Sequence, residues 1–102
     1  MFEIQDKVIV ITGATGALGG ALALSLAKAK AQLVILGRNQ ELLDELVSKL
    51  NIFTVVKTYI VNVMDRIDLI RVREEMKSHF DRIDVLINAV GGNLPGAVIP
   101  DD

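Results

Sequence analysis

Four short runs of aliphatic, mostly β-branched residues alternate along this chain with segments whose apolar residues recur at helical spacing. The runs lie at residues 8–11, 33–36, 55–61 and 85–87, the third being interrupted by Lys57-Thr58. Continuous runs of this kind are typical of strands buried on both faces of a parallel sheet. The alternation therefore predicts a three-layer αβα fold whose parallel strands lie in the order 3-2-1-4. The switch point falls between the first and fourth strands, and ligands gather at such points.

Each segment between the runs carries an apolar stripe that predicts a helix. Asn39 and Asp65 precede the second and third helices, where a short side-chain oxygen can accept a first-turn N–H as an N-cap. The predicted stripes are Leu18, Leu22, Leu26 and Ala29 in the first helix, Leu42, Leu43, Leu46, Val47 and Leu50 in the second, and Leu69, Val72, Met76 and Phe80, broadened by Ile67 and Ile70, in the third.

The composition narrows the classes of function. A chain of 102 residues is enough for one small domain with one core. Lys and Arg number 11 against 13 for Asp and Glu, so the charge gives no reason to expect nucleic acid or an anionic membrane as partner. The chain has no cysteine and no apolar run of membrane-spanning length. Two acidic residues precede the first apolar run, whereas a signal peptide would carry basic residues there. We therefore expect a cytoplasmic protein without disulfides or a metal site.

A glycine-rich turn, residues 12–19, connects the first strand to the first helix. Gly13 permits the tight turn out of the strand, and Gly19 lets the helix pack closely on the sheet. The helix start then presents free N–H groups and a positive dipole end to an anion. This pattern predicts a diphosphate site; the alternative is a tight turn without a ligand. The predicted contact residues are Gly13, Thr15, Gly16, Ala17, Leu18 and Gly19.

The ends of the other strands carry further candidate residues. Gly37-Arg38-Asn39 follows the second strand, where NAD-selective domains usually place an acid that holds the ribose 2′-hydroxyl. Arg38 would instead form charge-assisted hydrogen bonds with a 2′-phosphate, so we expect NADP(H) to be favoured over NAD(H). The alternative is an exposed arginine that is neutral to cofactor choice.

Asn62-Val63 ends the third strand, and residues 88–91 end the fourth. The Asn62 oxygen either accepts from an adenine amino group or caps the turn towards Asp65. Small residues after the fourth strand would let a ribose approach the backbone; the alternative is a plain glycine-rich loop. The candidates at the fourth strand are Asn88, Ala89, Val90 and Gly91.

Two of these motifs resemble the classical short-chain dehydrogenase/reductase family. Thr12-Gly13-x-x-x-Ala17-x-Gly19 resembles the family's Thr-Gly-x-x-x-(Ala/Gly)-x-Gly turn, and residues 84–91 resemble its Asp-x-Leu-x-Asn-Asn-Ala-Gly strand. The resemblance implies a Rossmann-like fold and binding of NAD(P). Within the family the chain is most similar to D-mannonate oxidoreductases (fructuronate reductases) and gluconate 5-dehydrogenases, on the segments 18–20, 35–39 and 88–95.

The chain departs from the family pattern at three places. Asn62 replaces the usual Asp, and Ala89-Val90 replaces an Asn-Ala or Gly-Ala pair. The third departure is that the family's Ser and Tyr-x-x-x-Lys lie beyond the fourth strand, outside this sequence. The single tyrosine, Tyr59, has Val at position 63 where the motif needs Lys, so we expect it to be a half-buried strand residue. His79 is interpreted as a cap or packing residue, so no catalytic residue is predicted.

The sequence therefore predicts that residues 1–102 form a partial NAD(P)-binding domain, truncated after the fourth strand and inactive by itself. The parent enzyme would transfer hydride between nicotinamide and a sugar acid or similar carbonyl, with D-mannonate/D-fructuronate as the named example, and only that parent would bind substrate. The alternatives are a non-catalytic dinucleotide-binding module or an inactive fragment. A Tyr-x-x-x-Lys motif encoded downstream would distinguish them. We also expect self-association, because the fourth strand would present an open edge.

Overall fold

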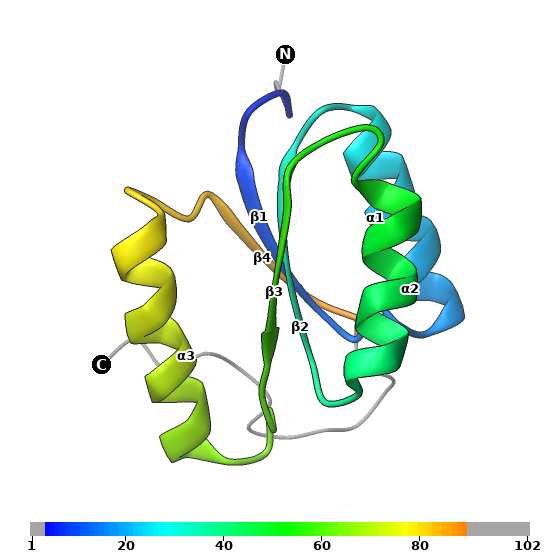
Figure 1. Ribbon diagram of the computed structural model, residues 1–102. Coiled ribbons are helices and arrows are strands. Elements are labelled where there is room, and N and C mark those ends of the chain that lie inside the picture. The colour runs from blue at the N-terminus through cyan, green and yellow to red at the C-terminus, as the bar shows by residue number, and fades with distance from the viewer. Residues whose placement is uncertain (1–3, 90–102) are drawn as a thin grey trace.

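The computed structural model of the chain describes residues 4–89, and within that range strands and helices alternate as predicted (Figure 1). The strands are β1 (Val8–Thr12), β2 (Gln32–Gly37), β3 (Val56–Ile60) and β4 (Val85–Asn88). The helices are α1 (Ala17–Lys28), α2 (Gln40–Leu50) and α3 (Arg66–His79).

The strands of the described range form one parallel sheet in the order β3-β2-β1-β4, which confirms the predicted topology. Thr12, the last residue of β1, lies opposite both Leu36 of β2 and Asn88 of β4. Gly37 pairs with Ile60 at the end of β3. The carboxyl ends of all these strands therefore meet along one edge of the sheet, and the loops that follow them are brought together there.

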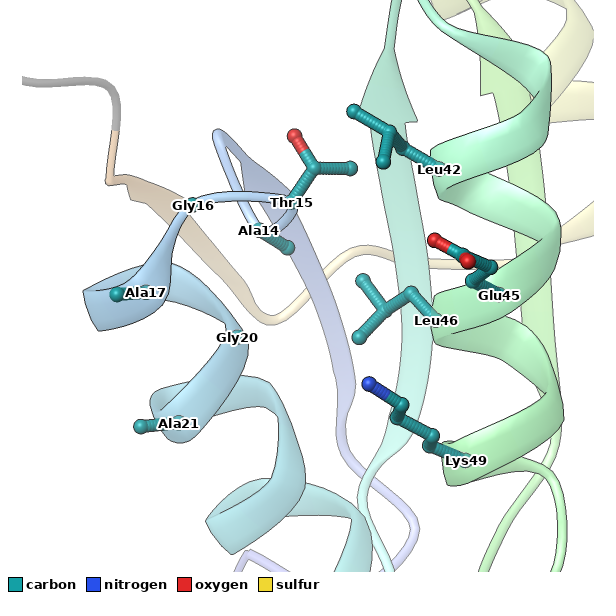
Figure 2. Close-up of a pocket in the computed structure, with 10 residues that line it drawn as sticks. All are labelled: Ala14, Thr15, Gly16, Ala17, Gly20, Ala21, Leu42, Glu45, Leu46 and Lys49. Carbon is teal, nitrogen blue, oxygen red and sulfur yellow. The ribbon is translucent and has the colours of Figure 1, made fainter.

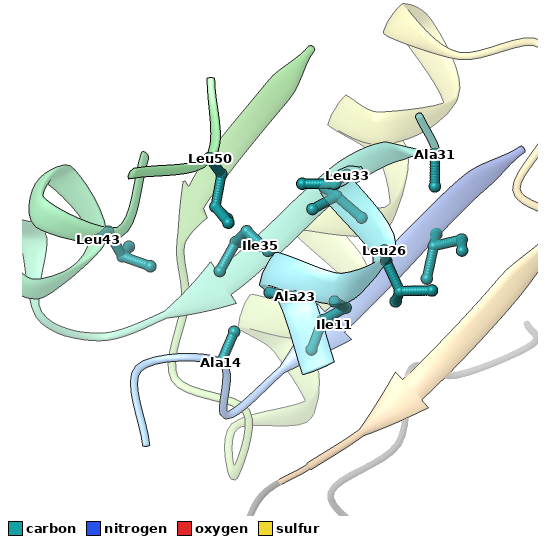
Figure 3. Packing of buried hydrophobic residues seen from close by; sticks show 11 residues of the cluster. Ile11, Ala14, Ala23, Leu26, Ala31, Leu33, Ile35, Leu43 and Leu50 are labelled. Atoms are coloured by element: carbon teal, nitrogen blue, oxygen red, sulfur yellow. The ribbon is translucent and has the colours of Figure 1, made fainter. Parts of the chain in front are cut away.

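Helices cover both faces of the sheet, with α1 and α2 on one side and α3 on the other (Figure 1). Alternate residues of each central strand point to opposite faces, and the core is accordingly divided in two. Ile9, Ile11, Leu33 and Ile35 pack with α1 and α2, as Figure 3 shows for three of them, whereas Val10, Val34 and Leu36 pack with α3. The predicted Rossmann-like three-layer architecture is confirmed.

The apolar stripe predicted for α1 is confirmed at Leu26, and Leu22 packs against the core, but the stripe as a whole is wrong in its rotation. Its buried residues are Gly19, Ala23, Leu26 and Ala27, whereas Leu18 is 78% exposed. At about 100° per residue, the observed face is turned by roughly 90° from the predicted one. The reason is that glycine and alanine let the helix axis approach the sheet more closely than a leucine stripe would.

The stripe of α3 is confirmed for Leu69, Val72 and Met76, which are buried. Ile67 does not broaden it, since this side chain is 80% exposed. On a helical wheel, residue 67 lies nearly opposite that face. None of the helices within residues 4–89 combines the length and the apolar character that spanning a lipid bilayer requires.

Both predicted N-caps are confirmed. The Asn39 side-chain oxygen accepts the N–H of Leu42 at 3.1 Å. One carboxylate oxygen of Asp65 accepts the N–H groups of Ile67 and Asp68 at 3.0 and 3.3 Å. Helices α2 and α3 thus begin with first-turn donors already satisfied by the chain itself.

Candidate functional site

The carboxyl ends of β1, β2 and β3 surround a cavity of about 390 Å³. Three segments that lie far apart in the sequence contribute to it: the glycine turn, the end of the second strand and the end of the third. The described residues that line it are Gly13, Thr15, Leu36, Gly37, Arg38, Asn39, Val61, Asn62, Val63 and Met64. Six of the predicted site residues are therefore neighbours in space.

The glycine turn has a backbone that only particular residues allow. Gly13 has a φ of 78°, in the left-handed region that glycine enters without strain, and its carbonyl accepts the N–H of Gly16 at 3.2 Å. A Cβ on Gly19 would overlap that same carbonyl oxygen and would lie 2.9 Å from the Cα of Ala14. The first turn of α1 therefore packs directly on the bend that precedes it.

Helix α1 begins differently from the other two helices. Gly16 occupies the N-cap position, so no side chain caps the helix, and its first turn contains no acid. Residues 15–18 are exposed. The first N–H groups and the positive end of the helix dipole therefore face solvent beside the cavity, which is an arrangement suited to an anion.

A second hollow, of about 290 Å³, adjoins the turn between α1 and α2. Figure 2 shows the side chains of Leu46 and Lys49 directed from α2 towards α1, with Thr15 near Leu42 at one end. Thr15 lines this groove as well as the larger cavity. Its hydroxyl is thus placed at the junction between the helix start and the strand ends.

Arg38 and Asn39 lie together at the cavity but differ in their interactions with the rest of the protein. The Asn39 oxygen caps α2, so this oxygen is already hydrogen bonded within the protein. Arg38 is exposed, and within residues 4–89 no carboxylate lies at ion-pair distance from it. None of the described residues lining the cavity is acidic. The electrostatic character of this end of the site is therefore positive.

Asn62 holds the turn that leaves β3. Its side-chain oxygen accepts the N–H of Met64, and its backbone oxygen accepts the N–H of Asp65, both at 3.0 Å. Its own N–H donates to a carboxylate oxygen of Asp68 at 2.7 Å. The structure thus shows the turn-capping role considered for Asn62, in a residue that also lines the cavity.

The end of β4 lies across β1 from this cavity, next to the glycine turn. The Thr12 hydroxyl donates to the side-chain oxygen of Asn88 at 2.9 Å, and the Ala89 N–H donates to the Thr12 carbonyl at 2.9 Å. These contacts place Asn88 and Ala89 at the expected switch point. Val90 and Gly91 lie outside the described residues.

Neither Tyr59 nor His79 is among the described residues that line the cavity. Tyr59 is buried among the residues that pack on α3, more deeply than the predicted half-buried position, and burial followed by the charge of Glu75 raises the pKa of its phenol. His79 is exposed and contacts the Phe80 ring, with 6.5 Å between ring centres. Within residues 4–89 no group of three acidic or histidine side chains suits a metal ion.

Sequence reasoning missed Asp68 and Arg71. Both lie on α3, and their i, i+3 spacing is that of ordinary surface ion pairs, yet both contact the backbone at the end of β3. The available signal was an acid in the first turn of a helix that already has a cap at Asp65. An acid in that first turn is free to bond the loop that precedes the helix.

The chain is similar in sequence to known oxidoreductases. The sequence profile described as short chain dehydrogenase matches residues 7–100. An uncharacterized oxidoreductase of Staphylococcus saprophyticus is 36% identical over 104 residues, which covers 100% of this chain and 44% of that protein. The chain thus spans less than half the length of this relative.

Solved structures are similar in fold and in sequence. A Haemophilus influenza structure with bound NAD, provisionally described as a D-mannonate oxidoreductase, superimposes with a TM-score of 0.80 and 36% identity, covering 91% of this chain and 34% of that one. L-sorbose reductase from Gluconobacter frateurii, complexed with NADPH and L-sorbose, gives a TM-score of 0.80 and 30% identity over 89% of this chain and 36% of that one.

Proposed function

This chain belongs to the short-chain dehydrogenase family, and from that premise we propose that it forms the cofactor-binding part of an NAD(P)-dependent oxidoreductase. The observation that carries the proposal is the start of α1. An uncapped helix N-terminus follows a turn that requires glycine, and it opens beside a cavity formed by the strand ends.

In this proposal the backbone N–H groups of residues 15–19, with the Thr15 hydroxyl, bind the diphosphate. The adenosine occupies the cavity against Asn62 and Val63, which line one wall of it. The nicotinamide side extends across β1 towards the segment 88–91, of which the structure describes Asn88 and Ala89. The bound cofactor would supply or accept the hydride.

We further propose that NADP(H) is favoured over NAD(H). Arg38 lies at the cavity without an ion-pair partner among residues 4–89, and no carboxylate of that range lines the cavity to hold a free 2′-hydroxyl. A guanidinium can form bidentate charge-assisted hydrogen bonds with a phosphate. One similar structure holds NAD and another holds NADPH, so the argument depends on Arg38.

Fluorescence titration of the chain with NADPH and NADH tests both parts. The wild type should bind NADPH more tightly. Arg38→Asp should weaken NADPH binding by about 10-fold or more, because it replaces a charge-assisted hydrogen bond with repulsion, and should leave NADH binding equal or stronger. Lys77→Asp makes the same change of net charge on the far part of α3 and serves as the control. Absence of binding to either cofactor would contradict the proposal.

For the whole protein we propose hydride transfer to or from a sugar acid or a similar carbonyl or alcohol, D-mannonate/D-fructuronate being the first pair to assay. The support is the resemblance of segments 18–20, 35–39 and 88–95 together with the provisional description of one similar structure. The proposal includes a cytoplasmic location. It also includes self-association through β4, whose outer edge pairs with no strand of residues 4–89 and whose Leu86 is 41% exposed.

A further inference from the structure

Asp68, in the first turn of α3, contacts the backbone that forms one wall of the cavity. Its Oδ2 accepts the N–H of Asn62 at 2.7 Å, a short distance typical of a charge-assisted hydrogen bond. Its Oδ1 accepts from the Nε of Arg71 at 2.9 Å and lies 2.8 Å from Nη2. The same Nη2 donates to the carbonyl of Ile60 at 2.9 Å. Two side chains of α3 thus hold both the last residue of β3 and the residue two positions later.

The segment they hold has few other hydrogen bonds to the rest of the protein. The N–H of Val61 donates to the carbonyl of Gly37 at 2.8 Å, so the ladder with β2 continues to this point. Beyond it, residues 62–64 make two local hydrogen bonds through the Asn62 oxygens, and the Asn62 N–H bonds to Asp68. Val61, Asn62, Val63 and Met64 nevertheless make up four of the ten residues that line the cavity. Val61 and Val63 also pack in the apolar cluster under α3, and the carboxylate of Asp68 adds the side-chain hydrogen bond that ties the backbone of this wall to that helix.

A merely local role for Asp68 explains the geometry less well. Asp65 already caps α3, so the helix does not need a second capping acid. An exposed i, i+3 ion pair contributes little to stability, yet the Asp68 side chain is 27% exposed against 51% for Arg71. The hydrogen bond from the Asn62 backbone, aided by Arg71, also holds the pKa of Asp68 below its usual value, so the carboxylate is charged at neutral pH.

We propose that Asp68, oriented by Arg71, is a positioning residue for the adenosine side of the cavity, acting through the backbone N–H of Asn62. The inference rests on the proposed cofactor-binding function. It assigns Asp68 an effect on how well the wall at residues 61–64 fits the adenosine, and no contact with the cofactor. The helix start that would bind the diphosphate belongs to α1 and should be unaffected.

The test combines an NADPH titration with NMR of the backbone amides in the same chain. Asp68→Ala should raise the Kd for NADPH about 10-fold. At saturating NADPH, the amide signals of residues 13–19 should shift as in the wild type, whereas the shifts of residues 61–64 should be reduced. Asp44→Ala is the matched control, because that carboxylate accepts a side-chain hydrogen bond from Gln40 on the surface of α2.

Asp68→Asn provides the conservative variant, because one amide oxygen can still accept the N–H of Asn62 while the charge facing Arg71 is lost. It should bind NADPH only about threefold more weakly than the wild type. If the alanine variant does not fold, the Kd of this variant tests the positioning role instead. An unchanged Kd in Asp68→Ala, an equal loss in Asp44→Ala, or altered shifts throughout residues 13–19 would overturn the positioning role. Failure of the proposed function is distinguishable, because it would appear as no NADPH binding by the wild-type chain.

Discussion

Gly19 carries the tightest single-residue constraint in the described structure, and a matched pair of glycines makes it testable. A Cβ at Gly19 would meet backbone atoms of Gly13 and Ala14, which cannot move aside as a flexible side chain can. A Cβ at Gly16 would instead lie at an ordinary 3.6 Å from the Gly13 carbonyl oxygen, and the φ of Gly16 is −80°.

Gly19→Ala should therefore lower the free energy of unfolding by about 1–3 kcal/mol, as overpacking does, and should also weaken NADPH binding. Gly16→Ala should change stability by well under that amount. Urea denaturation of the two variants beside the wild type measures the difference. Equal stabilities for the two alanine variants would show that the bend adapts to a Cβ at Gly19.

The sequence predicted that Gly19 lets the first helix pack closely on the sheet, and the structure shows that its close contact is with the turn that precedes the helix. The atom that excludes a side chain is the carbonyl oxygen of Gly13 within the turn, six residues earlier. No pattern of apolar residues encodes such a backbone contact. The roles of Asp68 and Arg71 were missed for a related reason, since their partners are the backbone groups of Asn62 and Ile60.

At the scale of elements, a carboxylate adds to the ladder that joins β4 to β1. The Val8 N–H donates to Oδ2 of Asp84 at 2.8 Å, while the Asp84 N–H donates to the Val8 carbonyl at 2.9 Å. Within residues 4–89, β4 pairs with no strand other than β1. The bond from Val8 lowers the pKa of Asp84 below its usual value, and the charges of Arg82 and Lys7 act in the same direction.

Because the pKa of Asp84 is lower in the folded chain, its contribution to stability is fully present above the unfolded pKa of about 3.9. That contribution is lost as the pH falls through the lower folded value. Asp84→Asn should therefore reduce stability at pH 7 and flatten the fall in unfolding free energy below about pH 4. Urea denaturation between pH 7 and pH 3 measures this slope.

Asp44→Asn on the surface of α2 is the control for the pH series, and it should leave the slope close to that of the wild type. Asp68 has a pKa lowered in the same direction, so part of the acid dependence should survive in Asp84→Asn. A slope for Asp84→Asn as steep as that of the wild type would show that the Val8 bond does not depend on the charge.

The strands were more predictable than the rotation of the helices about their axes. Central strands buried on both faces need continuous apolar runs, so Val8 to Ile11 and Leu33 to Leu36 are evident from sequence alone. The face that α1 buries depends instead on which side can approach the sheet most closely. That side carries Gly19 and Ala23 and leaves Leu18 exposed, which a count of leucines does not reveal.

For the whole molecule, too, some features could be predicted from the sequence and others could not. Alternating elements and the handedness of parallel connections leave few possible strand orders, and the observed order determines where the loops meet. Six predicted site residues consequently line one cavity even though they come from three separate segments. The sequence also predicted that the Asn39 oxygen caps α2. What it could not supply is the pairing of the charged group there, since Arg38 has no ion-pair partner within residues 4–89.

Cofactor binding should therefore be visible as a change in the stability of the whole domain. A ligand that binds only the folded chain stabilises it by about 2.7 kcal/mol at 100 times its Kd. For a domain of this size such a gain raises Tm by roughly 10–20 °C. Differential scanning fluorimetry at equal concentrations of NADPH and NADH should show the larger shift with NADPH.

Arg38→Asp should reverse that order without lowering the Tm of the unliganded chain by more than a few degrees, since Arg38 is exposed and has no ion-pair partner in the described range. Gly19→Ala should reduce both shifts, because it disturbs the diphosphate-binding turn that the two cofactors share. Equal shifts with NADPH and NADH in the wild type would contradict the preference assigned to Arg38 while leaving the dinucleotide site intact. A shift that survives unchanged in Gly19→Ala would place the cofactor elsewhere on the molecule.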